Sequence, residues 1–119
     1  MILKNTRHIG ENNKLLGLSC DTLRYYEKIG LLIKIKRTKG GIRCYTYDNV
    51  SRLQFIQRAK SMDFTLDEIK HLLCFRDDPT RCSEKARNLV HSKTYLIEGK
   101  IRRLETLHQE LTSLLDRRD

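Results

Sequence analysis

The sequence predicts a mainly α-helical fold in which short helices and one tight hairpin precede a long C-terminal helix. Three observations lead to this prediction. Apolar residues recur at helical spacing through most of the chain. Two adjacent glycines, Gly40 and Gly41, stand among basic residues in a stretch with strand character. Beyond the single proline, Pro79, one apolar seam continues at heptad spacing to Leu115.

The first elements are indicated by their end signals. Residues 1–7 are expected to form a loose leader, and residues 9–16 a first helix of about two turns. Ser19 is a good N-cap for a second helix from Cys20 to Lys28. That helix should end before Gly30, because glycine favours helix C-termini. A helix, a short turn and a second helix therefore open the chain.

The second helix and the segment after it carry exposed basic and aromatic residues. Leu23 and Tyr26 lie three positions apart and can share the core face, so Arg24 and Tyr25 should point away from the core, toward a ligand. Residues 31–47 should form two short strands around the paired glycines, which permit the positive φ of a tight hairpin. A hairpin directly after two short helices is the outline of a winged helix-turn-helix.

Two more helices are expected to follow. Residues 48–62 form the third helix, with Asp48 as its cap and apolar positions at Val50, Leu53, Phe55, Ile56 and Ala59. Thr65, followed three residues later by Glu68, is a capping box that opens the fourth helix. The buried stripe of the fourth helix is Ile69, Leu72 and Leu73. Residues 77–80 should end it, because they include the proline.

The fifth helix should span residues 83–115, which is longer than an ordinary globular helix. Its seam consists of Val90, Ile97, Ile101, Leu104, His108, Leu111 and Leu115. This seam has no obvious partner within the chain, so it predicts that two chains pair as a homodimeric coiled coil. The alternative is a helix that folds back on its own domain. The seam alone does not fix whether the paired helices run parallel or antiparallel.

Positive charge is concentrated in the half of the chain that carries the hairpin. Residues 1–60 contain 13 Lys and Arg against 4 Asp and Glu, whereas residues 61–119 contain 11 of each. A helix that fits a DNA groove, beside a basic loop that contacts phosphates, gains affinity by releasing counterions. We therefore expect a winged-helix DNA-binding region with following helices over residues 1–76, a linker over 77–82 and a dimerisation helix over 83–119. The alternative is a basic domain without a nucleic-acid partner.

Other classes of protein are disfavoured by the composition. No apolar run approaches the ~20 residues that span a bilayer, and the N-terminus lacks the apolar core of a secretory signal. A cytoplasmic location without a membrane partner is therefore expected. The four cysteines have no CxxC spacing and are not expected to form a disulfide framework there. An enzyme is not expected, because no nucleophile–base grouping or phosphate-binding loop is present.

Several segments together match a known pattern. They are Ile9-Gly10-Glu11, Gly17-Leu18-Ser19, Asp21-Thr22-Leu23-Arg24-Tyr25-Tyr26-Glu27, Gly30-Leu31-Leu32, the wing residues Arg37, Gly41, Arg43 and Tyr45, and Leu53, Phe55, Ile56, Ala59 and Phe64-Thr65-Leu66-Asp67-Glu68-Ile69. On these residues the chain resembles the MerR family of transcriptional regulators over about residues 9–82. It departs from the pattern at Asn12 and Asn13, where an apolar pair is usual, and at Ile42, where an aromatic is common.

The resemblance implies a homodimer joined by antiparallel long helices. Such a dimer binds double-stranded, pseudo-palindromic promoter DNA with an unusually long spacer. When its effector is bound, it distorts the DNA so that RNA polymerase can engage both promoter elements, which uses DNA deformation as a switch. The effector, the target promoter and the choice between activation and repression are not fixed by the sequence.

The residues expected to contact DNA lie on the second helix, the wing and the third helix. They are Arg24, Tyr25, Tyr26, Lys39, Arg43, Tyr45, Arg58 and Lys60. Arg24 and Tyr25 are the first candidates for groove and backbone contacts, whereas Tyr26 should lie half in the core. Arg43 and Tyr45 form the second pair, in the wing. The last two residues of the set could clamp flanking phosphates.

Cys82 is the candidate metal-sensing residue. It follows the break at Pro79 and stands at the start of the long helix, where the helix dipole favours the thiolate form that binds metals. In the metal-sensing branches of the family, which respond to zinc, cadmium, lead or mercury, a cysteine here completes a site with cysteines near the far end of the partner's helix. This chain stops at Asp119 without such a cysteine or a metal-binding loop. Either it is truncated, or its site is lost or changed.

Alternatives for the site and for the function stay open. A zinc site takes about four ligands, and the candidate substitutes are His71, Cys74, His91 and His108. Cys74 is better explained as a small buried hydrophobe and His108 as a polar seam residue. Zinc, cadmium, lead, mercury and copper are the candidate ions. A thiol redox-responsive regulator that uses Cys82 or Cys74 is one alternative. An architectural or recombination-accessory DNA-binding protein is another, although the long dimer helix argues against it.

Overall fold

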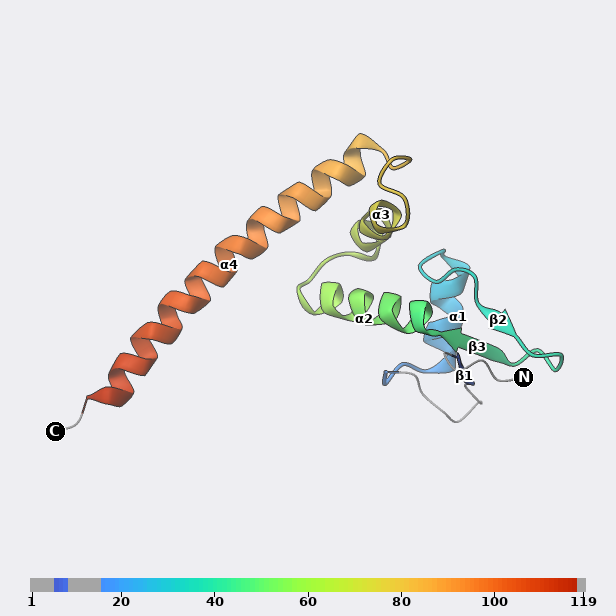
Figure 1. Ribbon diagram of the computed structural model, residues 1–119, viewed down its shortest axis with the longest axis horizontal. Coiled ribbons are helices and arrows are strands. Elements are labelled where there is room, and N and C mark those ends of the chain that lie inside the picture. Colours follow the sequence, from blue (N-terminus) through green and yellow to red (C-terminus); the bar gives the residue numbers. More distant parts are fainter. Residues whose placement is uncertain (1–5, 9–15, 118–119) are drawn as a thin grey trace. The chain divides into compact units, whose positions relative to one another are not determined.

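The computed structural model describes residues 6–8 and 16–117, and Figure 1 shows their arrangement along the chain. The elements in order are β1 (Thr6–His8), α1 (Cys20–Lys28), β2 (Lys36–Arg37), β3 (Arg43–Thr46), α2 (Tyr47–Ser61), α3 (Leu66–Asp77) and α4 (Glu84–Asp116). The mainly α-helical fold with a winged helix-turn-helix, a second helical pair and a long C-terminal helix is thereby confirmed. The first helix expected over residues 9–16 falls almost wholly outside the described residues.

The chain divides into two compact units between Leu73 and Cys74. The first unit contains the small sheet, α1, α2 and most of α3. The second contains the end of α3, the following turn and α4. The domain limits expected at residues 76 and 82 stay a prediction.

The sheet is antiparallel, with β3 in the centre between β1 and β2. Thr6 pairs with Thr46 and His8 with Cys44, while Arg37 pairs with Arg43 on the other side. The expectation of a loose leader over residues 1–7 is therefore wrong at its end, because Thr6 and the residue after it belong to β1. The sequence around residues 6–8 does not predict this strand, because its hydrogen bonds are made with β3, almost 40 residues further along the chain.

The wing is a shorter hairpin than the 31–47 span suggested, with strands of two and four residues. Gly41 has a φ of +83°, a backbone conformation that residues other than glycine rarely adopt. The amide of Gly41 donates to the carbonyl of Thr38 at 2.9 Å, and the amide of Thr38 donates to the carbonyl of Ile42 at 2.9 Å. These bonds close the turn and place Lys39 at its tip.

Helix α1 begins and ends where its capping residues predict. The Ser19 hydroxyl accepts from the amide of Thr22 at 3.2 Å. At the other end Gly30 adopts a φ of +84°, and the amide of Leu31 donates to the carbonyl of Tyr26 at 2.9 Å. The predicted inner face is confirmed, because Leu23 and Tyr26 are both buried.

Helix α2 is capped by Thr46 rather than by Asp48. The Thr46 hydroxyl accepts from the amide of Asn49 at 3.2 Å, and the Asn49 side-chain oxygen accepts from the amide of Thr46 at 3.0 Å. This is a capping box in which asparagine takes the place usually held by glutamate or glutamine. It starts the helix one residue earlier than expected, at Tyr47, so Asp48 lies in the first turn instead of at the cap.

Helix α3 follows the sequence prediction closely. The amide of Thr65 donates to the Glu68 carboxylate at 3.0 Å, and the Thr65 hydroxyl accepts from the amide of Glu68 at 3.1 Å. This reciprocal pair is the predicted capping box. The predicted stripe of Ile69, Leu72 and Leu73 is buried, and the helix ends at Asp77, two residues before the proline.

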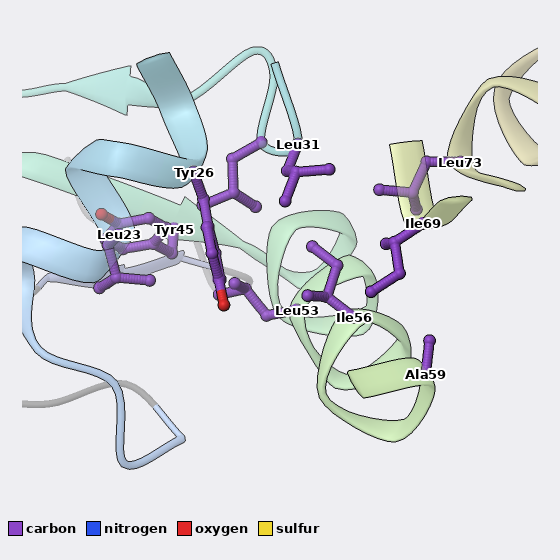
Figure 2. Close-up of a cluster of buried hydrophobic side chains, with 10 residues drawn as sticks. Leu23, Tyr26, Leu31, Tyr45, Leu53, Ile56, Ala59, Ile69 and Leu73 are labelled. Carbon is purple, nitrogen blue, oxygen red and sulfur yellow. The ribbon is translucent and has the colours of Figure 1, made fainter. Parts of the chain in front are cut away.

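The core of the first unit joins α1, the wing base, α2 and α3. Figure 2 shows its side chains, with the α1 and β3 residues on one side of α2 and the α3 residues on the other. Its members are Leu23, Tyr26, Leu31, Leu32, Tyr45, Leu53, Ile56, Ala59, Ile69 and Leu73. Burial of these apolar side chains is the main force that fixes α1 against the wing.

Two buried polar side chains that no sequence pattern indicated hold the segment between α1 and the wing. The Asn49 amide donates to the carbonyl of Ile33 at 3.1 Å. The Arg52 guanidinium donates to the carbonyl of Leu31. Both side chains are buried, so they satisfy backbone oxygens that water reaches poorly. They tie the start of the wing to α2.

Helix α4 runs over 33 residues, close to the predicted 83–115. The Ser83 hydroxyl caps it by accepting from the amide of Ala86 at 3.2 Å. Most of its side chains are exposed in this single chain. Among the described residues, no helix combines the length and the apolar composition that a membrane span requires.

Candidate nucleic-acid interface

Helix α1 presents two of the predicted DNA-contacting residues to solvent. Arg24 is exposed and Tyr25 has an exposed fraction of 50%. The Arg24 guanidinium lies 3.3 Å from the Asp21 carboxylate one turn earlier, an exposed ion pair worth little in water. A phosphate or base edge could therefore displace Asp21 at small cost. Contact of Arg24 and Tyr25 with DNA stays a prediction.

Tyr26 is more deeply buried than expected. Its exposed fraction is 3%, so its ring belongs to the core and offers DNA almost no surface. The exposed Lys60 ammonium donates to the Tyr26 hydroxyl at 3.3 Å and lies 5.9 Å from the ring centroid. The structure thus brings together two residues that were predicted separately, and it links the end of α2 to α1.

Tyr45 is not available to DNA, contrary to the expectation. Its exposed fraction is 1%, and burial is the main cause that raises the pKa of its hydroxyl. The physical reason is that Tyr45 belongs to the core cluster together with residues of α1 and α2, such as Leu23 and Leu53. Tyr45 is a core residue that fixes the wing against α1.

The wing is bound to α1 through one carboxylate. Arg37 donates to the two Glu27 carboxylate oxygens at 2.8 and 3.1 Å, and the Arg43 Nε donates to Glu27 at 3.1 Å. The Glu27 side chain is only 24% exposed and that of Arg43 26% exposed, so solvent screens these ion pairs incompletely. Arg43, predicted as a wing contact, is therefore held in a fixed position beside the exposed face of α1.

Glu27 was not among the predicted site residues. The signal that could have identified it is a carboxylate within a segment of strong positive charge, because such a group can form ion pairs with the basic residues around it. The remaining predicted contacts, Lys39 at the wing tip and Arg58 on α2, are exposed. The described site is thus an exposed basic set around α1 and the wing, with Glu27 as its internal anchor.

The outer half of α4 carries an exposed apolar stripe. Of the predicted seam, Ile101, Leu104, Leu111 and Leu115 are exposed, and Leu104 reaches 65%. Val90 and Ile97 are half-buried and His108 is exposed. Leu107 and Leu114 were missed, although both are exposed and lie three residues after predicted seam positions. An apolar stripe of this extent on one helix is typical of a surface that another helix covers.

The cysteines near the start of α4 differ from the expectation. Cys74 is exposed rather than buried, and its Sγ lies 2.6 Å from the Sγ of Cys82, with both thiols free. In the first unit Cys44 is buried and Cys20 half-buried. The loop between α3 and α4 therefore brings together two cysteines that were not predicted to meet.

The prediction that the helix dipole favours a Cys82 thiolate is wrong for this structure. Desolvation, the hydrogen bond with the Cys74 thiol and the negative charges of Cys74, Asp78 and Asp77 together raise the pKa of Cys82 to about 11. The dipole is weak here because Cys82 precedes the N-cap, Ser83, and lies outside the first turn. Desolvation and the neighbouring Cys74 thiol are the larger causes of the raised pKa, ahead of the two aspartates.

The described residues do not complete a metal site by themselves. Across residues 6–8 and 16–117, no group of three or more His, Cys, Asp and Glu side chains is arranged to hold an ion. Of the candidate substitutes, His71 faces the Asp67 carboxylate at 3.9 Å, while His91 and His108 are exposed on α4. The described part of one chain therefore does not offer zinc its four ligands.

Comparison with known proteins agrees with this geometry. A family model described as "MerR HTH family regulatory protein" matches residues 8–74, and one described as "MerR, DNA binding" matches residues 50–114. The HTH-type transcriptional regulator ZntR of Escherichia coli (strain K12) is 36% identical over 110 residues, which cover 91% of this chain and 77% of ZntR.

Two solved structures are also similar. The transcription regulator PbrR691 from Ralstonia metallidurans CH34, in complex with lead(II), has a TM-score of 0.50 at 36% identity, with 83% of this chain and 77% of that chain covered. HiNmlR, a MerR family regulator lacking the sensor domain and bound to promoter DNA, has a TM-score of 0.59 at 28% identity, with 84% and 79% covered. These proteins are regulators and not enzymes. The chain belongs to the MerR family of DNA-binding transcriptional regulators.

Proposed function

We propose that this regulator works as a homodimer that distorts a long-spacer promoter for RNA polymerase in response to a soft or transition metal ion. The observation that carries the proposal is the exposed face of α1 beside a wing that Glu27 anchors to it. This arrangement offers Arg24 and Tyr25 to a groove while Lys39 reaches a neighbouring phosphate. It would act where promoter DNA lies, in the cytoplasm.

Dimerisation is supported by the stripe on α4. Leu104, Leu107 and Leu111 leave at least half of their surface exposed in the single chain. Covering such side chains removes apolar area from water, at roughly 25 cal/mol per Å². A second copy supplies the matching stripe by symmetry, and two copies would present two basic units to the two halves of a pseudo-palindromic site.

Sensing is the part of the proposal that depends on Cys82. The lead(II) complex of PbrR691 supports a metal effector, and zinc, cadmium, mercury and copper are the other candidates. Cys82 would supply one thiolate and thereby soft-ligand character. Because the described residues of one chain do not complete a site, the other ligands would come from the partner chain or from residues beyond those described.

The sensing proposal can be tested with Cys82→Ser and, as the matched control, Cys20→Ser. Native mass spectrometry with zinc, cadmium, lead, mercury and copper measures metal bound per protein, and gel shift on promoter fragments selected by the wild type measures DNA binding. We expect Cys82→Ser to lose the metal while it keeps DNA binding, and Cys20→Ser to keep both. Undiminished metal binding by Cys82→Ser would refute the role of Cys82.

A further inference from the structure

We propose that Cys74 and Cys82 form a redox-active dithiol that closes to an intrachain disulfide between the end of α3 and the start of α4. This site goes beyond the metal response proposed above. It is carried by the juxtaposition of two free thiols from different elements, with 2.6 Å between their sulfur atoms.

The separation of the sulfurs favours a bond over a shared ion. A disulfide bond is about 2.05 Å long, so the two thiols need to approach by only about half an ångström. Two thiolates on one zinc ion, at about 2.3 Å each with a tetrahedral angle, stand roughly 3.8 Å apart. The observed 2.6 Å is therefore nearer to the length of a disulfide bond than to the spacing of two zinc ligands.

The intervening loop holds the two cysteines in place. The Asp78 amide donates to the carbonyl of Cys74 at 3.1 Å, and the Asp78 carboxylate accepts from the amide and hydroxyl of Thr80 at 3.1 and 2.7 Å. From α4, the Arg87 guanidinium donates to the carbonyl of Pro79 at 3.3 Å and lies 5.7 Å from the Phe75 ring.

These contacts belong to the same unit as both thiols, since the second unit starts at Cys74. The loop does not need to fold anew when the disulfide forms. A site that is already organised in this way reacts without the ordering cost that a flexible loop would bear.

An oxidant can reach the pair. Cys74 is exposed and Cys82 is half-buried, whereas Cys44 is buried. With a peroxide as oxidant, a thiolate attacks one peroxide oxygen, the O–O bond breaks, and the products are a sulfenic acid and, after protonation, water or an alcohol. The second thiol then attacks the sulfenic sulfur, the S–S bond forms, the S–O bond breaks, and the hydroxyl leaves as water with the thiol proton. The two sulfurs together lose two electrons, which the peroxide gains.

The disulfide would have two consequences. It would fasten α3 to α4 across the loop, and it would remove the Cys82 thiolate from any metal site. The second consequence rests on the proposed function, whereas formation of the disulfide does not. Oxidation and metal binding would then exclude each other at Cys82.

The test uses the full chain, reduced, freed of reductant and treated with stoichiometric hydrogen peroxide. Trypsin cuts after Lys70, Arg76, Arg81 and Lys85, so the two cysteines fall on separate peptides, residues 71–76 and 82–85, which stay together only if a disulfide joins them. We expect these peptides to appear linked, and the intact chain to lose about 2 Da, the mass of two hydrogens.

Matched variants separate this pair from other cysteines. Cys74→Ser and Cys82→Ser should each abolish the intrachain loss of mass, whereas Cys20→Ser combined with Cys44→Ala should retain it. Peptides linked through Cys20 or Cys44, or a bond between the Cys82 residues of two chains, would overturn the assignment, as would the absence of any linked peptide.

Cadmium distinguishes failure of this proposal from failure of the metal proposal. If Cys82 is a metal ligand, saturating cadmium should slow formation of the linked peptides. Linked peptides that form equally fast with cadmium would uphold the dithiol and contradict the metal role of Cys82. Absence of the linked peptides, together with loss of metal binding in Cys82→Ser, would contradict the dithiol and uphold the metal role of Cys82.

Discussion

At the scale of single residues, two exposed cations on the DNA-binding unit should act differently. Arg24 stands on α1 and forms an exposed ion pair with Asp21, whereas Lys60 at the end of α2 rests against Tyr26. A base contact carries sequence information, and a phosphate contact does not. Variants of these two residues therefore distinguish sequence-specific base contacts from nonspecific contacts with the DNA backbone.

We expect Arg24→Ala to weaken binding and relax sequence choice, and Lys60→Ala to weaken binding to all sequences alike. Each lost phosphate contact should flatten the slope of log affinity against log salt by roughly 0.9. Fluorescence anisotropy on a selected site and a scrambled site at several salt concentrations measures both effects. Wild-type selectivity in Arg24→Ala would show that α1 is not the reading helix.

The thiol of Cys82 gives a pH-dependent prediction. Because its pKa is raised to about 11, alkylation of the reduced protein at Cys82 should rise about tenfold per pH unit and level off only near that value. Cys74→Ala removes a hydrogen bond and a neighbouring charge, so levelling should move to lower pH. The rate is read from the mass of the peptide that contains Cys82. Levelling at or below pH 9 in the wild type would contradict the raised pKa.

The raised pKa of Cys82 also makes folding stability depend on pH. The unfolded chain ionises Cys82 near the ordinary thiol value while the folded chain keeps it protonated up to about pH 11. Ionisation therefore favours the unfolded state within that window, and the contribution of this group to folding stability falls as the pH rises through it.

At the scale of elements, the junction of α1 and the wing depends on Glu27. Its carboxylate neutralises two arginines near the DNA-binding face, so removal of its charge alone should raise attraction to phosphates. Removal of its hydrogen bonds should instead free Arg37 and Arg43 and loosen the wing. The two effects have opposite signs, which makes a substitution informative.

We expect Glu27→Gln to weaken DNA binding, because loss of the fixed wing outweighs the gain in net positive charge. Asp48→Asn is the matched control: it removes the same charge from an exposed position in the first turn of α2 and should leave binding equal or slightly stronger. Circular dichroism checks that both variants fold. Tighter binding by Glu27→Gln than by the control would show that Glu27 does not position the wing.

The elements also show which parts of the structure can be predicted from sequence. Ser19 and Thr65 were identified correctly, because a cap bonds to an amide three residues away and is readable locally. Burial of Tyr45 was not predictable in this way, since it depends on how α1 and α2 pack against β3, which no local pattern describes. The meeting of Cys74 and Cys82 depends likewise on the path of a loop that periodicity does not describe.

At the scale of the whole molecule, association through α4 is the step that would turn one DNA-binding unit into a pair. Exposed leucines along a long helix are costly in water, and the stripe of a second copy would cover them. Sequence periodicity anticipated most of this stripe but omitted Leu107 and Leu114, because a strict alternation of four and three gives a narrower seam than the apolar face of a real helix.

We expect Ile101→Glu combined with Leu104→Glu to give monomers, since four charges would then meet in one interface. Thr106→Glu adds one negative charge near the opposite side of the helix and should leave association intact. Monomers should bind a two-half-site DNA more weakly while they keep weak binding to a half-site. Sedimentation velocity on each variant follows the association directly.

The native mass of the unmodified reduced chain at micromolar concentration tests most directly whether two copies of this regulator act together. Because the α4 stripe is exposed on one chain and a second copy would cover it, we expect a species of about twice 14.1 kDa. A species of 14.1 kDa alone under these conditions would contradict it.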